Sequence, residues 1–350
     1  MSMPPRDPQE ATASMRPRDP EEATATSEPV HAGIPAATRM GAVHLTVSNL
    51  ERSVDYYESV IGLRVRDREG ARAMLGAGGE DLLVSGAGGE DLLVLVERPG
   101  ASPVRGYCGL YHFALLLPQR IDLARWLAHA ARDRVALVGL SDHFVSEAIY
   151  LSDPDGHGIE IYWDRPREVW EGKVAERMTT LPLDTSSLFG ELADPASGSF
   201  EPGGELADPA SGSVDSVSDR VDLLDASFDG LPAATAMGHV HLCVADIPRT
   251  VAFYRDVLGF ALMASLGGQA AFLSAGGYHH HLGANTWESA GAGQAPEGAA
   301  TLRAATVVLP GEVERDLLVA RLADGAYETV AREDCVLVHD PSGNPILLAV

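Results

Sequence analysis

The sequence predicts an α+β fold of four βαβββ modules, and three observations lead to this prediction. The stretch 43–62 matches the stretch 240–259 at a constant offset of 197 residues, so the chain contains an internal duplication. Residues 153–156 (DPDG) match residues 340–343 (DPSG) at a second offset of 187 residues. Within each half, an alternating apolar strand is twice followed by an amphipathic helix and further short strands. Each half is therefore expected to hold two modules.

The two offsets differ because ten residues have entered the first half. Residues 76–85 (GAGGEDLLVS) are followed at once by residues 86–95 (GAGGEDLLVL), so the extra residues are a local tandem copy. We interpret this copy as sequence slippage without a function of its own.

The four strand-helix units can be followed in order along the chain. In the first unit, Val43, Leu45 and Val47 alternate along one face of a strand, and an amphipathic helix follows until Gly62 ends it. Residues 63–65 then begin the next strand. The other three units combine a strand and a helix at 111–118 and 122–132, at 238–244 and 246–258, and at 302–310 and 312–322.

Composition divides the chain into four parts. Residues 1–39 are rich in Pro, Ala, Thr and acidic residues without a folding period, which predicts a disordered tail. Residues 40–164 are expected to form domain 1, with modules one and two, and residues 233–350 to form domain 2, with modules three and four. Between them, the acidic residues 165–232 are rich in Pro, Ser and Gly, which predicts a long linker.

The charge of the chain limits its partners. The formal net charge is -24, from 50 acidic and 26 basic residues, which disfavours nucleic acid and anionic membrane surfaces. Cys108, Cys243 and Cys335 are odd in number and widely spaced, so they indicate neither a disulfide framework nor a cysteine metal site. No apolar run approaches the length of a membrane span. We expect a cytoplasmic protein, and a homo-oligomer is compatible with the sequence.

A histidine on the opening strand of a module and Asp-Pro-x-Gly-x-x-x-Glu on a closing strand resemble the vicinal oxygen chelate superfamily. That superfamily includes glyoxalase I, bleomycin-resistance proteins and extradiol ring-cleaving dioxygenases. The resemblance covers residues 40–164 and 233–350. It implies that pairs of modules curl into two open barrels, with metal ligands on the first and last strands of modules.

The stretch from His143 to Glu160 (HFVSEAIYLSDPDGHGIE) is the most specific part of the resemblance. It is similar to the extradiol dioxygenase motif, and only Ser141, two residues before the histidine, departs from the usual residues. The resemblance implies that Glu160 is an iron ligand, Tyr150 a hydrogen-bond partner of the substrate, and His143 a group near the bound oxygen. On the residues alone, 153–156 could instead be a hairpin turn and Tyr150 a core residue.

His112 stands at the family's ligand position on the opening strand of module two, where the following apolar residues project the imidazole to one face. A triad of two histidines and one carboxylate needs a further histidine. Aligning Asp246 with Asn49 places His239 at the corresponding position of module three. The resemblance therefore implies a metal triad of His112, Glu160 and His239.

Modules one and four lack ligands at the corresponding positions, which are Ala42, Ala304 and Leu347. His44 shares a strand face with Ala42 but lies about 6.6 Å further along, which makes it a poor substitute. We therefore expect modules two and three to form the metal-binding barrel across the linker, and modules one and four to form a barrel without metal.

Three consecutive histidines, His279, His280 and His281, follow Tyr278 in module three. In extradiol enzymes a histidine at this place is the acid-base residue. The resemblance favours His281, with His279 as the second choice because alternate residues share a strand face. The three histidines could also be surface residues without a role.

The resemblance implies an Fe(II)-dependent extradiol dioxygenase of aromatic catabolism, similar to the two-domain catechol 2,3-dioxygenase-like proteins. It would cleave a catechol-type aromatic diol with O2, with His281, Tyr150 and His143 as catalytic groups. Mn(II) or another divalent metal is the alternative to Fe(II). Two rival hypotheses stay open: a glyoxalase- or epimerase-type metal isomerase with His281 as a fourth ligand, and a metal-free binding protein of the bleomycin-resistance kind. The retained triad argues against the binder, because buried ionisable groups without partners are costly.

Overall fold

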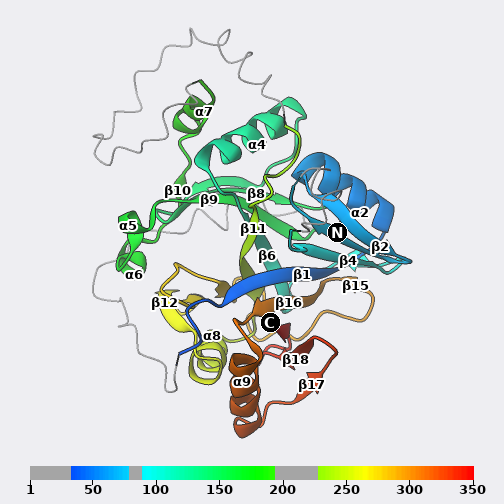
Figure 1. Cartoon of the computed structure of the whole chain (residues 1–350), viewed down its shortest axis with the longest axis vertical. Coiled ribbons are helices and arrows are strands. Elements are labelled where there is room, and N and C mark those ends of the chain that lie inside the picture. The colour runs from blue at the N-terminus through cyan, green and yellow to red at the C-terminus, as the bar shows by residue number, and fades with distance from the viewer. Residues whose placement is uncertain (1–32, 79–88, 194–227) are drawn as a thin grey trace, which may run out of the picture.

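The computed structural model describes residues 33–78, 89–193 and 228–350, and within them two large curled sheets are flanked by helices (Figure 1). One sheet has eight strands in the order β17-β18-β19-β16-β1-β4-β3-β2. The other has nine strands in the order β10-β7-β8-β9-β6-β11-β14-β13-β12. This architecture confirms the predicted α+β class.

The first half of the chain folds into two modules. Module one comprises β1 (Arg39–Val47), α2 (Leu50–Tyr56), the π-helical turn η2 (Tyr57–Ile61), β2 (Arg64–Glu69), β3 (Arg72–Gly76) and β4 (Leu93–Glu97). Module two comprises β6 (Gly109–Leu116), α4 (Arg120–Arg132), β7 (Gly139–Asp142), β8 (Ser146–Ser152) and β9 (Gly158–Asp164). The first helix has a local start signal and a local stop signal, because the Asn49 side chain accepts from the backbone of Arg52 and Gly62 adopts a φ of 92° after η2.

The second half repeats this plan. Module three comprises β11 (Ala236–Cys243), α8 (Ile247–Val251), the π-helical turn η4 (Ala252–Val257), β12 (Ala261–Leu266), β13 (Ala270–Ser274) and β14 (Leu282–Asn285). Module four comprises β16 (Leu302–Val308), α9 (Glu312–Asp324), β17 (Thr329–Ala331), β18 (Cys335–His339) and β19 (Pro345–Ala349). The short strands β5 (Ser102–Pro103) and β15 (Ala299–Ala300) pair with each other. None of the described helices is long and apolar enough to span a membrane.

Each sheet combines one module from each half of the chain. In the nine-stranded sheet, β6 of module two pairs antiparallel with β11 of module three. In the eight-stranded sheet, β1 of module one pairs antiparallel with β16 of module four. The expected pairing of modules two with three and one with four is therefore confirmed. The residue boundaries of two domains stay a prediction, because both sheets draw on both halves.

The two faces of the nine-stranded sheet differ in chemistry. Phe113 and Leu115 of β6 are fully buried in the main hydrophobic core. Strand alternation places Ala114 on the opposite face, where it packs with Ala148 and Tyr162 in a separate small cluster. We call this second face the site face, because the predicted metal ligands lie on it.

The predicted linker is partly wrong, because its first residues are folded. They form α5 (Arg167–Trp170), α6 (Val174–Arg177), β10 (Leu181–Pro182) and α7 (Thr185–Ala193). The physical reason is apolar burial: Trp170 and Val174 pack with Val145 of module two and Phe272 of module three. Residues 194–227 lie outside the described residues.

The predicted tail and the tandem copy are described only in part. Residues 1–32 and 79–88 lie outside the described residues. Ile34 is buried, and its backbone nitrogen donates a 2.8 Å hydrogen bond to the carbonyl of Gly259. The end of the predicted tail is therefore part of the fold.

Candidate metal centre

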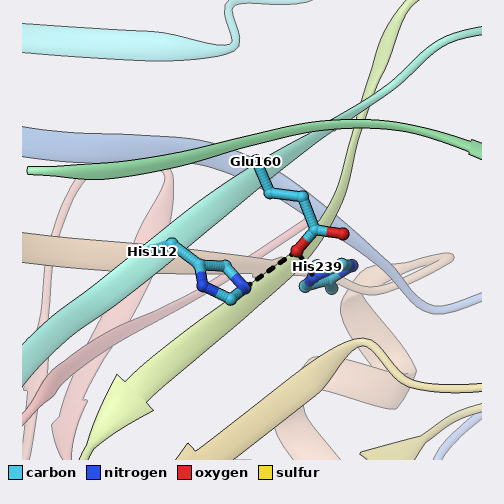
Figure 2. Close-up of side chains that lie close together, drawn as sticks. All are labelled: His112, Glu160 and His239. Atoms are coloured by element: carbon cyan, nitrogen blue, oxygen red, sulfur yellow. Dashed lines mark hydrogen bonds and ion pairs between the residues drawn. The ribbon is translucent and has the colours of Figure 1, made fainter. Parts of the chain in front are cut away.

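His112, Glu160 and His239 come together on the site face from three adjacent strands (Figure 2). Ala114 of β6 is the cross-strand neighbour of Glu160 on the parallel strand β9 and of His239 on the antiparallel strand β11. His112 lies two residues before Ala114 and so projects from the same face. One ligand atom from each of the three lies within 4.8 Å of the other two. The predicted triad is therefore assembled in space.

One carboxylate oxygen is the meeting point of the three side chains. Oε2 of Glu160 lies 3.0 Å from Nε2 of His112 and 3.1 Å from Nε2 of His239. The contact with His112 is not aligned as a hydrogen bond, so that buried nitrogen has no hydrogen-bond partner among the described residues. A buried nitrogen that faces a carboxylate without a hydrogen bond is suited to bind a cation.

The charges of the centre also suit a divalent metal. Burial raises the pKa of Glu160, but attraction to His239 and contact with His112 outweigh burial and hold this pKa well below its usual value. Burial lowers the pKa of His239, and Glu160 only partly offsets it. Both lowered pKa values favour the forms that bind a metal, an ionised carboxylate and a neutral imidazole. Two histidines and one carboxylate on one face match a site for a divalent metal with open positions.

Tyr150 and His143 lie together beside the triad. Tyr150 on β8 is the cross-strand neighbour of Glu160, and its ring centroid lies 5.5 Å from that of His112. Nε2 of His143 lies 2.7 Å from the Tyr150 hydroxyl, and its Nδ1 lies 2.8 Å from the carbonyl of Thr179. Because a carbonyl only accepts, Nδ1 of a neutral His143 carries the hydrogen and the Tyr150 hydroxyl donates to Nε2.

The three consecutive histidines differ in how near they lie to the triad. His281 is not among the ligands brought together at Glu160, and its Nδ1 accepts a 3.1 Å hydrogen bond from the backbone of Ala275. The ring of His280 instead lies 4.0 Å from that of His239, centroid to centroid. Strand alternation gave His279 as the second choice, but β14 begins only at Leu282, so the three histidines lie in the connection from β13. His280 is thus the histidine beside the centre.

An aromatic group that the sequence did not indicate borders the triad. The ring of His241 lies 5.0 Å from His112, 5.1 Å from Tyr111 and 5.7 Å from Trp287. Tyr111 and Trp287 are 38% and 42% exposed, so they mark the open side of the centre. Alternation from His239 could have found His241. Tyr111 could not be found in this way, because it is the extra residue of a bulge where the partners shift from His112 to Leu110.

The eight-stranded sheet has no counterpart of the triad. In that sheet His44 is the cross-strand neighbour of Ala304, and Thr306 is the neighbour of Leu347. Burial and the positive charges of Arg72, Arg303 and Arg332 lower the pKa of His44 to about 4. Within the described ranges, only the group around Glu160 brings three ligands close enough for a metal.

The chain resembles known proteins over most of its length. The family model of the Glyoxalase/Bleomycin resistance protein/Dioxygenase superfamily matches residues 39–161 and 236–346. Catechol-2,3-dioxygenase of Bacillus subtilis (strain 168) is 39% identical over 311 residues, which cover 87% of this chain and 94% of that protein.

Two solved structures share the fold. A proposed dioxygenase from Bacillus subtilis subsp. subtilis str. 168 matches with a TM-score of 0.55 at 13% identity, covering 91% of this chain and 86% of that one. A glyoxalase I mutant from Zea mays matches with a TM-score of 0.50 at 13% identity, covering 89% of this chain and 94% of that one. At these identities the two structures support the fold alone.

Proposed function

Because this chain belongs to the Glyoxalase/Bleomycin resistance protein/Dioxygenase superfamily, we propose that it is an Fe(II)-dependent extradiol dioxygenase acting on a catechol-type aromatic diol with O2. The observation that carries the proposal is the convergence of His112, Glu160 and His239 beside Tyr150 and His280. The 39% identity to a catechol-2,3-dioxygenase supports the same activity.

His112, Glu160 and His239 would hold the metal, with Mn(II) or another divalent ion as the alternative to Fe(II). Bound there, the metal would supply open positions for the two diol oxygens and O2 and a path for electrons between them. The buried site face would exclude water from this reaction, since the three ligands are between 1% and 7% exposed.

Tyr150 would act as a fixed hydrogen-bond partner of the substrate. Burial, together with the negative charge of Glu160, raises the pKa of Tyr150 well above its usual value, so the hydroxyl keeps its proton. His143 accepts from this hydroxyl at 2.7 Å and thereby orients it. Since its one hydrogen goes to His143, the Tyr150 oxygen would accept a hydrogen bond from a diol hydroxyl and so orient the substrate.

His280 would be the acid-base residue in place of His281. Burial lowers the pKa of His280 well below its usual value, and the neighbouring His239 and His279 lower it further. A neutral imidazole can take a proton from a diol hydroxyl and return it later in the reaction. We therefore assign to His280 the role that the sequence suggested for His281.

A glyoxalase- or epimerase-type isomerase is the rival within the same family. Such an enzyme would need a fourth protein ligand, and His281 was the candidate. Nδ1 of His281 is engaged with the backbone of Ala275, and His281 is not among the ligands that lie together at Glu160. The described residues therefore favour the dioxygenase.

The proposal is tested by measuring O2 uptake on adding catechol to protein loaded anaerobically with Fe(II). Uptake with a yellow ring-opened product is expected, and His239→Ala should abolish both. His44→Ala is the matched control, because His44 lies on the other sheet. Isomerisation of a thiohemiacetal without O2 uptake would instead support the rival, and inactivity towards a panel of catechols would contradict the dioxygenase.

A further inference from the structure

His280, the histidine beside the metal centre, is joined to a carboxylate through its neighbour His279. The Nδ1 atoms of His280 and His279 lie 2.8 Å apart. Nε2 of His279 lies 2.7 Å from Oδ1 of Asp164. The His279 side chain is fully buried, whereas that of Asp164 is 20% exposed. A line of three hydrogen-bonded side chains thus runs outward from the centre.

The acceptors in this line decide where its protons lie. An ionised carboxylate only accepts, so Nε2 of His279 carries a hydrogen that it donates to Asp164. In a neutral imidazole the other nitrogen is then an acceptor, so Nδ1 of His279 accepts. Nδ1 of His280 is left as the donor in their 2.8 Å contact. Nε2 of His280 therefore has no hydrogen and keeps its lone pair.

The free lone pair belongs to the nitrogen that is available to the centre. Since Nδ1 of His280 is engaged with His279, Nε2 is the ring nitrogen left for other partners. The ring packs against His239, at 4.0 Å, and against Phe272, at 5.1 Å, centroid to centroid. His280 therefore presents a proton acceptor beside the metal ligands.

The second carboxylate oxygen of Asp164, Oδ2, also accepts a hydrogen bond. The Tyr278 hydroxyl donates a 2.7 Å hydrogen bond to Oδ2 of Asp164 and lies 2.8 Å from the Tyr162 hydroxyl. Because Tyr278 donates to the carboxylate, Tyr162 donates to Tyr278. Gly238 makes room for this pair, since a Cβ at that position would lie 1.7 Å from the Tyr162 hydroxyl oxygen. One oxygen of Asp164 thus remains for His279.

A single strand supplies both carboxylates. Glu160 and Asp164 lie four residues apart on β9, on the same face, while His279 and His280 come from module three. The ring of Trp170, from the folded part of the predicted linker, lies 5.4 Å from that of His279. The line is therefore built at the contact between modules two and three, next to the triad.

We propose that His279 and Asp164 are positioning residues that hold His280 in the tautomer with Nδ1 protonated and Nε2 free to accept a proton from a substrate hydroxyl. The inference deepens the proposed function and rests on it for the substrate class, an aromatic diol. A histidine side chain free in water prefers the opposite tautomer, with the hydrogen on Nε2. The hydrogen bonds from His280 to His279 and from His279 to Asp164 would stabilise the tautomer with the hydrogen on Nδ1, as the aspartate does for the histidine of serine-protease triads.

The tautomer can be read directly by two-bond hydrogen-nitrogen correlation NMR on metal-free protein labelled with 15N-histidine. His280→Gln identifies the signals of His280 by their loss. In the unmutated protein we expect a protonated Nδ1 and an unprotonated Nε2. In Asp164→Leu we expect Nε2 to carry the hydrogen or the two forms to mix. Tyr278→Phe is the matched control, because it removes the other contact of Asp164 and should leave the His280 tautomer unchanged.

Two results would overturn the proposal. One is an Nε2-protonated His280 in the unmutated protein. This measurement does not depend on the folding of any variant. The other is a folded Asp164→Leu protein with the same tautomer as the unmutated one. With Fe(II) bound, Asp164→Leu should lower kcat about 10- to 100-fold and leave KM nearly unchanged, because it acts on proton transfer. Lack of any catechol cleavage would contradict the proposed function but not the tautomer, since the NMR measurement uses metal-free protein.

Discussion

Glu160 and His239 lie 79 residues apart in the chain, yet Nε2 of His239 is 3.1 Å from Oε2 of Glu160. Both are cross-strand neighbours of Ala114, on opposite sides of β6. The centre thus exists only where β6 of the first half pairs with β11 of the second half. Neither half holds all of the ligands.

Replacing the carboxylate of the triad should weaken metal binding. Glu160→Gln keeps the shape of the side chain but removes the negative charge that balances a divalent cation. We expect the affinity for Fe(II) or Mn(II) to fall by more than ~100-fold, beyond the loss typical for residues that only support a ligand. Competition with a chelator measures it. Glu147→Gln is the control, because that buried carboxylate of the same sheet pairs with Arg120 and Arg165 instead. Equal losses in both variants would contradict a metal at Glu160.

Removing the Tyr150 hydroxyl should slow the reaction without loss of metal. Tyr150→Phe deletes the hydroxyl that His143 orients, and kcat should fall about 10- to 100-fold. Steady-state kinetics and the iron content of the same sample check the prediction. Tyr107→Phe, at a residue that is 41% exposed, should behave like the unmutated protein. If iron content fell in parallel with kcat, Tyr150 would have a structural role instead.

His44 should make the fold sensitive to acid. Its pKa in the folded protein is lowered to about 4 from the usual 6.5. Between these two values the unfolded chain binds more protons, so acidification through this window favours unfolding. Between pH 7 and pH 5 the protonation of His44 in the unfolded chain should lower the unfolding free energy by about 2 kcal/mol. In His44→Gln this part of the decrease should be absent. Urea unfolding at both pH values measures this. His339→Gln, at an exposed histidine, is the control, and the same pH dependence in all three proteins would refute the prediction.

A methyl group at Gly238 should destabilise the nine-stranded sheet. The added Cβ would lie 1.7 Å from the Tyr162 hydroxyl oxygen, so the ring or the strand must move. We expect Gly238→Ala to cost about 1 to 3 kcal/mol and to lower Tm. Gly293→Ala is the control, because nothing lies within 4 Å of its added Cβ. Thermal unfolding of the two variants decides, and an unchanged Tm for Gly238→Ala would show that this close approach is easily relieved.

The sequence by itself determined those features that depend on local patterns. The resemblance to the extradiol dioxygenase motif implied His112 and Glu160 as ligands. Strand alternation indicated that His112 projects to one face, because the direction of a side chain on a strand follows from its neighbours along the chain. The repeat then indicated His239. The start and end of the first helix, at Asn49 and Gly62, depend on capping and on a positive φ, which are also local.

Tertiary structure decided what local patterns could not. His280 lies beside the triad, at a place in the connection before β14 that neither the resemblance nor strand alternation indicated. Tyr111 reaches the centre through a bulge that exists only when β6 pairs with β11. Trp170 folds the start of the predicted linker because it finds apolar partners on both modules. In each case the outcome depends on packing between segments distant in the chain. A pattern of neighbouring residues does not predict that packing.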